Sequence, residues 1–115
     1  MKYRKLGRTG VDVSELVFSC AETVGLLTSG NYGTALEAVR RAHDAGINWF
    51  DTSPSDTGGE AEVILGRILK ELDAHPHISA KVEINPGASE EIFVQIERAL
   101  EQTLERLQIE QIDLF

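Results

Sequence analysis

The sequence has little of several features that mark large classes of protein. Its one cysteine, Cys20, excludes a disulfide within the chain. No apolar run approaches the roughly 18 residues of a membrane span, and the basic N-terminus is not followed by the apolar core of a signal peptide. Basic residues are scarce, because 11 Lys and Arg against 19 Asp and Glu give a formal net charge of -8. We therefore expect a cytoplasmic protein that binds neither nucleic acid nor membrane, since both attract basic surfaces.

What the chain does contain is a regular alternation of strand-like and helix-like segments. Hydrophobic residues make up 42% of 115 residues, enough for one small domain or part of a larger one. Alternation at this spacing predicts a parallel sheet with helices outside it, either a small open sheet or part of a (β/α)₈ barrel. The expected order is a hairpin over residues 2–13, strand 16–20, helix 34–45, strand 47–51, helix 60–72, strand 77–82, helix 89–107 and strand 112–115.

The first expected helix has signals at both ends. Thr34 and Glu37 have the spacing of a capping box, in which each side chain caps the backbone N–H of the other residue. Gly46 is placed to end the helix in a left-handed conformation. These signals predict a helix that begins at Thr34.

Five segments carry a more specific pattern. They are Tyr3–Gly10 followed by Val13 and Ser14, Ala45–Pro54, Gly58–Arg67, Ile78–Val82 and Leu107–Phe115. In this order and spacing they resemble the aldo-keto reductases over essentially the whole chain. The resemblance implies an α/β fold made of an N-terminal hairpin and about half of a (β/α)₈ TIM barrel, with four barrel strands. Residues 1–115 would then be one partial domain, with the hairpin at 2–13 and the βα units at 16–115, because a complete barrel needs roughly 200 residues or more.

The same resemblance implies a function. The family consists of oxidoreductases that use NADPH or NADH to reduce small aldehydes and ketones, and its active site contains an Asp, a Tyr, a Lys and a His. The Tyr donates a proton to the carbonyl oxygen, the Lys paired with the Asp lowers the pKa of the Tyr, and the His orients the carbonyl.

This chain matches only part of that site. Asp51 stands at the position of the family Asp and Lys81 at that of the family Lys. Asp56 stands where the Tyr is expected, and the His would follow the fourth strand, beyond Phe115. In the first strand the family favours a small Gly-rich run, and this chain departs from it with Ser19-Cys20-Ala21. The resemblance implies Ser19, Cys20 and Asp51 as the cofactor contacts.

The substitution at position 56 predicts that this chain is inactive alone. An ordinary Asp has a pKa near 3.9 and holds no proton to donate at neutral pH. Tyr32 is a less favoured substitute donor. The alternative function is a non-catalytic half-barrel that self-associates through its open sheet edges.

Two other patterns have simpler interpretations than a ligand site. His75 and His77 lack a third ligand at metal spacing, so we expect exposed histidines at a strand edge and no metal. Gly58 and Gly59 either form an anion-binding turn or simply start a helix.

Overall fold

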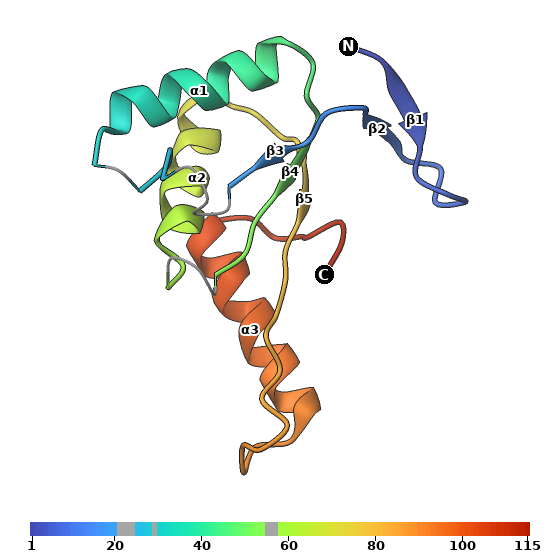
Figure 1. The fold of residues 1–115 in the computed structure, drawn as a ribbon, viewed down its shortest axis with the longest axis vertical. Coiled ribbons are helices and arrows are strands. Elements are labelled where there is room, and N and C mark those ends of the chain that lie inside the picture. The colour runs from blue at the N-terminus through green and yellow to red at the C-terminus, as the bar shows by residue number, and fades with distance from the viewer. Residues whose placement is uncertain (21–24, 29, 55–57) are drawn as a thin grey trace.

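The computed structural model describes residues 1–20, 25–28, 30–54 and 58–115. Within them the chain forms an antiparallel hairpin and a parallel sheet of three strands that alternate with helices (Figure 1). The hairpin lies to one side of the sheet strands and helices α1 and α2 to the other in this view. The elements are β1 (Tyr3–Lys5), β2 (Asp12–Ser14), β3 (Phe18–Ser19), α1 (Tyr32–Asp44), β4 (Trp49–Asp51), α2 (Glu60–Glu71), β5 (His77–Ser79) and α3 (Ile92–Leu107). The predicted α/β alternation is confirmed.

The parallel sheet has two chemically different faces. Its strands run in the order β3-β4-β5, with Phe50 opposite both Phe18 and Ile78. Phe50 and Ile78 belong to the core under the helices. Successive side chains in a strand point to opposite faces, so Trp49 and Asp51 lie on the other face. The helix-covered face is therefore apolar, and the opposite face carries the polar groups.

Helices α2 and α3 pack closely because α2 has a glycine at the contact. A Cβ atom on Gly66 would lie 2.6 Å from the carbonyl carbon of Leu107, well inside normal contact distance. Leu107 is buried at the end of α3, and Leu65 and Ile68 are buried in α2. The segment that follows β5 then runs alongside α3 (Figure 1), where the Gln95 amide bonds the backbone of Asn85.

The start of α1 corrects the capping-box prediction. The helix begins at Tyr32, and Asn31 is its N-cap, with the backbone N–H of Thr34 donating to Asn31 Oδ1 at 3.1 Å. Asn caps a helix at least as well as Thr, and it stands three residues earlier. Glu37 instead pairs with Arg40 and Arg41. The predicted end is confirmed, since Gly46 follows the C-cap with φ +85.

The side chains of Asn48, just before β4, and of Tyr3 in β1 fasten the hairpin to the sheet. Asn48 Oδ1 accepts from the backbone N–H of Ser14 at 2.8 Å, and its Nδ2 donates to the carbonyl of Asp12 at 2.8 Å. The Tyr3 hydroxyl donates to the carbonyl of Gly46 at 2.8 Å. The hairpin is thus held at the end of the sheet where β4 begins.

The predicted fourth strand is reduced to a single bridge in the described part of the chain. Leu114 pairs in parallel with Ser79, and the N–H groups of Asp113 and Leu114 both reach the carbonyl of Ile78. The N–H of Ala80 also donates to the carbonyl of Leu114 at 2.9 Å, which completes this one bridge. The prediction of four barrel strands is therefore wrong for the described residues, whose parallel sheet has three strands and one added bridge.

A buried ion pair joins α2, α3 and the end of β4. Glu62 is fully buried, and its Oε2 accepts from Arg106 Nε at 2.6 Å. Glu62 Oε1 accepts from the Thr52 hydroxyl at 3.3 Å, and Arg106 also donates to Thr103 Oγ1 at 3.1 Å. A buried carboxylate is tolerated only when it is paired and hydrogen-bonded, and these contacts satisfy it.

Removing the cation of this pair should destabilise the fold strongly. We expect Arg106→Met to lower the free energy of unfolding by about 3–5 kcal/mol, because Glu62 is left buried without a counter-charge. The double variant Glu62→Met with Arg106→Met should recover most of that loss. Urea unfolding, followed by the fluorescence of Trp49, measures both. A loss under about 1 kcal/mol in the single variant would show that the pair is not a structural requirement.

The one thiol of the chain lies in the core. Cys20 is 3% exposed and clusters with core residues that include Phe50. Burial raises the pKa of the Cys20 thiol to about 12, and the nearby carboxylates of Asp51 and Glu62 add to the effect. The thiol is therefore neutral and unreactive at physiological pH.

This raised pKa gives the folded chain a pH dependence above pH 9. The native state keeps the Cys20 proton between the ordinary value of 9.0 and about 12, so its contribution to stability is complete below pH 9 and is lost as pH rises toward 12. Urea unfolding at pH 8 and pH 10.5 should show a larger drop for the natural chain than for Cys20→Ala. Equal drops in the two chains would contradict the assignment.

Candidate functional site

Asp51 and Lys81 meet where β4 and β5 end. Asp51 is the last residue of β4, and Lys81 follows the end of β5 by two residues. Lys81 Nζ donates to Asp51 Oδ2 at 2.5 Å. The two strands are parallel neighbours, so their carboxyl ends lie at one edge of the sheet, where α/β proteins place their ligands.

This pair is open to solvent on its Lys81 side. The Lys81 side chain is 56% exposed and that of Asp51 is 28% exposed. Ion pairs at such sites contribute only about 0–1 kcal/mol to stability. The contact therefore contributes little to the stability of the fold.

The second carboxylate oxygen of Asp51 accepts a hydrogen bond from a buried side chain. Ser79 Oγ donates to Asp51 Oδ1 at 2.7 Å, and Trp49 Nε1 donates to Ser79 Oγ at 2.9 Å. Trp49 and Ser79 are both buried. Sequence reasoning did not single out either residue, although their period-two spacing from Asp51 and Lys81 is a signal that could have found them.

The two other expected cofactor contacts lie in different surroundings. Ser19 ends β3, is exposed and stands opposite Asp51 in the sheet register. Cys20 donates its backbone N–H to the carbonyl of Asp51 at 2.8 Å, but its side chain is buried in the core. Asp56 lies outside the described residues.

Tyr32, the other candidate proton donor, contacts side chains of α2. Its hydroxyl donates to Glu71 Oε2 at 2.6 Å, and the Arg67 guanidinium lies 4.3 Å from the centre of its ring. Desolvation raises the pKa of Tyr32, and the Glu71 carboxylate adds to the shift. These contacts join the start of α1 to α2.

The histidines have carboxylate partners rather than a metal-like arrangement. His77 Nδ1 lies 2.8 Å from Asp113 Oδ1, and the other Asp113 oxygen accepts from the N–H of Ile78 at 2.9 Å. His75 pairs with Asp73 at 3.4 Å. Among the described residues, no cluster of three metal-ligating side chains occurs. The sequence did not reveal the role of Asp113, which fastens the last segment to β5.

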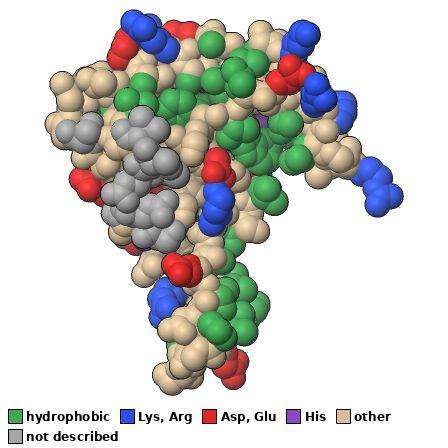
Figure 2. Space-filling view, viewed as in Figure 1, with side chains coloured by type: hydrophobic (Ala, Val, Ile, Leu, Met, Phe, Trp, Pro, Cys, Tyr) green, Lys and Arg blue, Asp and Glu red, His purple; other side chains and the backbone are tan. Residues whose placement is uncertain are grey.

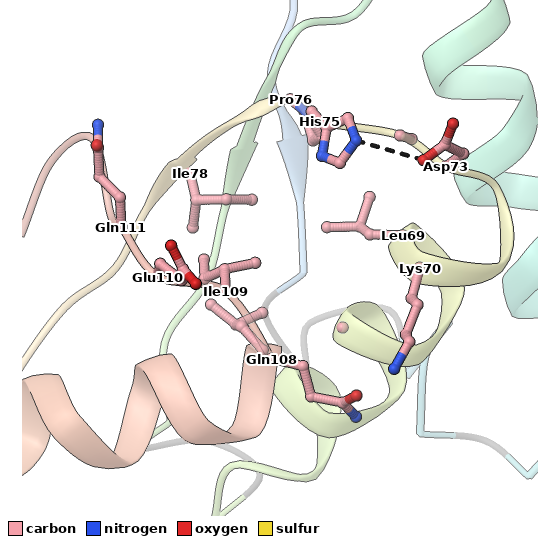
Figure 3. Close-up of a pocket in the computed structure, with 13 residues that line it drawn as sticks. Leu69, Lys70, Asp73, His75, Pro76, Ile78, Gln108, Ile109, Glu110 and Gln111 are labelled. Carbon is pink, nitrogen blue, oxygen red and sulfur yellow. Dashed lines mark ion pairs between the residues drawn. The ribbon is translucent and has the colours of Figure 1, made fainter.

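A pocket of about 590 Å³ lies at the opposite end of β5 (Figure 3). Its floor is apolar, from Leu69, Ile78 and Ile109, and Lys70 and His75 lie at its rim. It opens beside the residues that precede β5, whereas Lys81 follows that strand. None of the predicted site residues lines it.

In the described part of the chain, none of the helices has the length and apolar character needed to cross a bilayer.

Comparison with known proteins gives one consistent result. The model of the aldo/keto reductase family matches residues 23–115. The chain is 32% identical to L-galactose dehydrogenase of Arabidopsis thaliana over 118 aligned positions, which cover 99% of this chain and 37% of that protein. It is 28% identical to the aldo-keto reductase YhdN of Bacillus subtilis, covering 100% of this chain and 37% of that protein.

A solved structure shares the same arrangement. The holo form of aldo-keto reductase AKR11C1 from Bacillus halodurans is 27% identical and superposes with a TM-score of 0.72, over 98% of this chain and 38% of that one. The chain thus spans well under half the length of the relatives that it matches. The family model covers most of the chain, and the chain therefore belongs to the aldo/keto reductase family.

Proposed function

We propose that this chain is the N-terminal part of an aldo-keto reductase-type barrel and supplies Asp51 and Lys81 to a site for NAD(P)H-dependent reduction of aldehydes or ketones. We propose also that it does not catalyse this reaction alone. The observation that carries the proposal is the 2.5 Å contact between Lys81 and Asp51 at the carboxyl ends of adjacent parallel strands. In this assignment residues 1–115 are one partial domain, with the hairpin at 2–13 and the βα units at 16–115.

The chemistry available to the pair is electrostatic. An ammonium group beside a hydroxyl favours the ionised form of that hydroxyl and lowers its pKa. Asp51 fixes Lys81 and partly balances its charge. This arrangement would support a proton donor near Lys81, but the resemblance puts Asp56 at the donor position, and an ordinary Asp holds no proton to donate at neutral pH.

The described residues fit only a small part of a nicotinamide dinucleotide. Ser19 and Asp51 offer polar groups at the strand ends, whereas Cys20 is buried. A pyrophosphate needs cations or free N–H groups at a helix start. The start of α2 does not provide an open cradle, because a Cβ on Gly59 would lie 2.5 Å from the Arg106 side chain, which Glu62 already binds. The start of α2 therefore does not fit a pyrophosphate, and we derive no step through the cofactor.

Titration calorimetry with NADPH tests this proposal. We expect no binding by the purified 115-residue chain and no oxidation of NADPH with a panel of aldehydes and ketones. The reasons are that the start of α2 offers no open cradle for a pyrophosphate and that Asp56 stands at the expected position of the tyrosine. Lys81→Met serves as the control for any heat that is observed. Saturable binding that Lys81→Met abolishes would overturn the proposed inactivity.

A second candidate function is self-association, and exposed apolar residues at the sheet edge favour it. Leu16 and Val17 precede β3, which pairs only with β4 among the described strands, and Leu114 and Phe115 are exposed beside β5. Hydrophobic side chains also gather over the lower part of α3 (Figure 2), where Phe93 is exposed. Open strand edges with apolar neighbours favour pairing with another chain.

Two valines of similar exposure distinguish pairing at the strand edge from nonspecific hydrophobic association. Val17 lies at the β3 edge and is 50% exposed, and Val63 lies on α2 and is 47% exposed. Val17→Lys should weaken a dimer by about tenfold or more, as loss of a central interface contact does. Val63→Lys should leave the dimer unchanged. Sedimentation velocity over a range of concentrations measures both, and a natural chain that stays monomeric would exclude this function.

A further inference from the structure

The Asp51 carboxylate is held through both of its oxygens. Oδ2 accepts from Lys81 Nζ at 2.5 Å, and Oδ1 accepts from Ser79 Oγ at 2.7 Å. A carboxylate bound through one oxygen can still rotate, whereas two bonds from different directions fix its plane. Ser79 and Lys81 together therefore fix the plane of the Asp51 carboxylate.

The chemistry of the groups sets the direction of these hydrogen bonds. An indole N–H can only donate, and a serine hydroxyl has one proton to give. Trp49 Nε1 donates to Ser79 Oγ at 2.9 Å, which leaves the hydroxyl proton of Ser79 for Asp51. An ionised carboxylate can only accept hydrogen bonds. Trp49 therefore donates to Ser79 and Ser79 donates to Asp51, and neither hydrogen bond can be reversed.

The sheet register places this chain of hydrogen bonds on a rigid base. Ser79 stands directly opposite Asp51, and Trp49 lies two residues before Asp51 on the same face of β4. Trp49 and Ser79 are each 6% exposed, and the ring of Trp49 lies 5.6 Å from that of His77. Packing therefore fixes Trp49 and Ser79 at one end of this series of hydrogen bonds, while Lys81 at the other end is open to solvent.

We propose that Ser79 is a positioning residue for the Asp51–Lys81 pair, and that the Trp49 indole fixes the direction of its hydroxyl. The importance of this arrangement for chemistry rests on the proposed function of the pair. The arrangement itself is independent of cofactor binding. It can therefore be tested on the natural 115-residue chain without any activity.

Nuclear magnetic resonance offers two direct readouts. Trp49 is the one tryptophan of the chain, so its indole N–H gives a single isolated signal. The ammonium signal of Lys81, assigned by its loss in Lys81→Met, reports whether Asp51 holds it. In Ser79→Ala we expect faster exchange of the indole proton, by several-fold to about tenfold for one lost hydrogen bond, and loss of the Lys81 ammonium signal.

Conservative and distant variants separate positioning from a general effect on folding. Ser79→Thr keeps the hydroxyl and should retain both signals. Thr103→Val removes a buried hydroxyl in α3 and should change neither. If Ser79→Ala unfolds, Trp49→Phe takes its place. It removes the indole N–H that donates to Ser79, and it should weaken the Lys81 signal. All samples are compared at one pH, because the exchange rate of the indole proton depends on pH and the His77 ring lies beside the indole.

The results distinguish the two proposals. An unchanged Lys81 signal in a folded Ser79→Ala chain, or in Trp49→Phe where the first variant does not fold, would overturn the positioning role. Loss of the signal in Ser79→Ala, or its weakening in Trp49→Phe where Ser79→Ala does not fold, together with its retention in Ser79→Thr and Thr103→Val, would establish that role. NADPH binding by the natural chain would overturn the proposed inactivity and leave the positioning role intact.

Discussion

The buried carboxylate of Glu62 is the contact on which the other parts of this structure depend. It joins α2 to Arg106 on α3 and to Thr52, the residue after Asp51. A charge in the core is stable only with such partners, so these elements have one relative position in which Glu62 is satisfied. The close approach of Gly66 to Leu107 fits the same position, because any side chain there would separate the two helices.

With α2 and α3 packed in this way, the two faces of the sheet carry different kinds of side chain. Phe18, Phe50 and Ile78 pack together under the helices and supply the apolar burial. The opposite face carries Asp51 and its partners, which end in a solvent-exposed ion pair with Lys81. A charged pair that contributes little to stability and stands at the carboxyl edge of a parallel sheet is the arrangement in which such folds place chemistry. In the proposed function this pair belongs to the reductase site, and Asp56 stands at the position that the resemblance assigns to the tyrosine.

Sequence reasoning succeeded where local patterns are decisive and failed where partners compete. The alternation of strands and helices follows from periodicity, and the end of α1 just before Gly46 follows from backbone preference. The start of α1 was misplaced because Asn31 and Thr34 are both good caps, and only the folded backbone selects one. The fourth strand was overestimated because an apolar run over residues 112–115 does not show how many of its residues pair with β5, and only Leu114 does.

The sequence by itself determined the family, the α/β class and the placement of Asp51 and Lys81 near the ends of neighbouring strands, because these features depend on short-range order along the chain. Tertiary structure alone decided that Glu62 is buried against Arg106, 44 residues away, and that Ser79 links Asp51 to Trp49, 30 residues before it. The physical reason is that a side chain's hydrogen-bond partners depend on distances across the fold. Sequence spacing fixes which face of a strand or helix a residue occupies, and only packing fixes what that face meets.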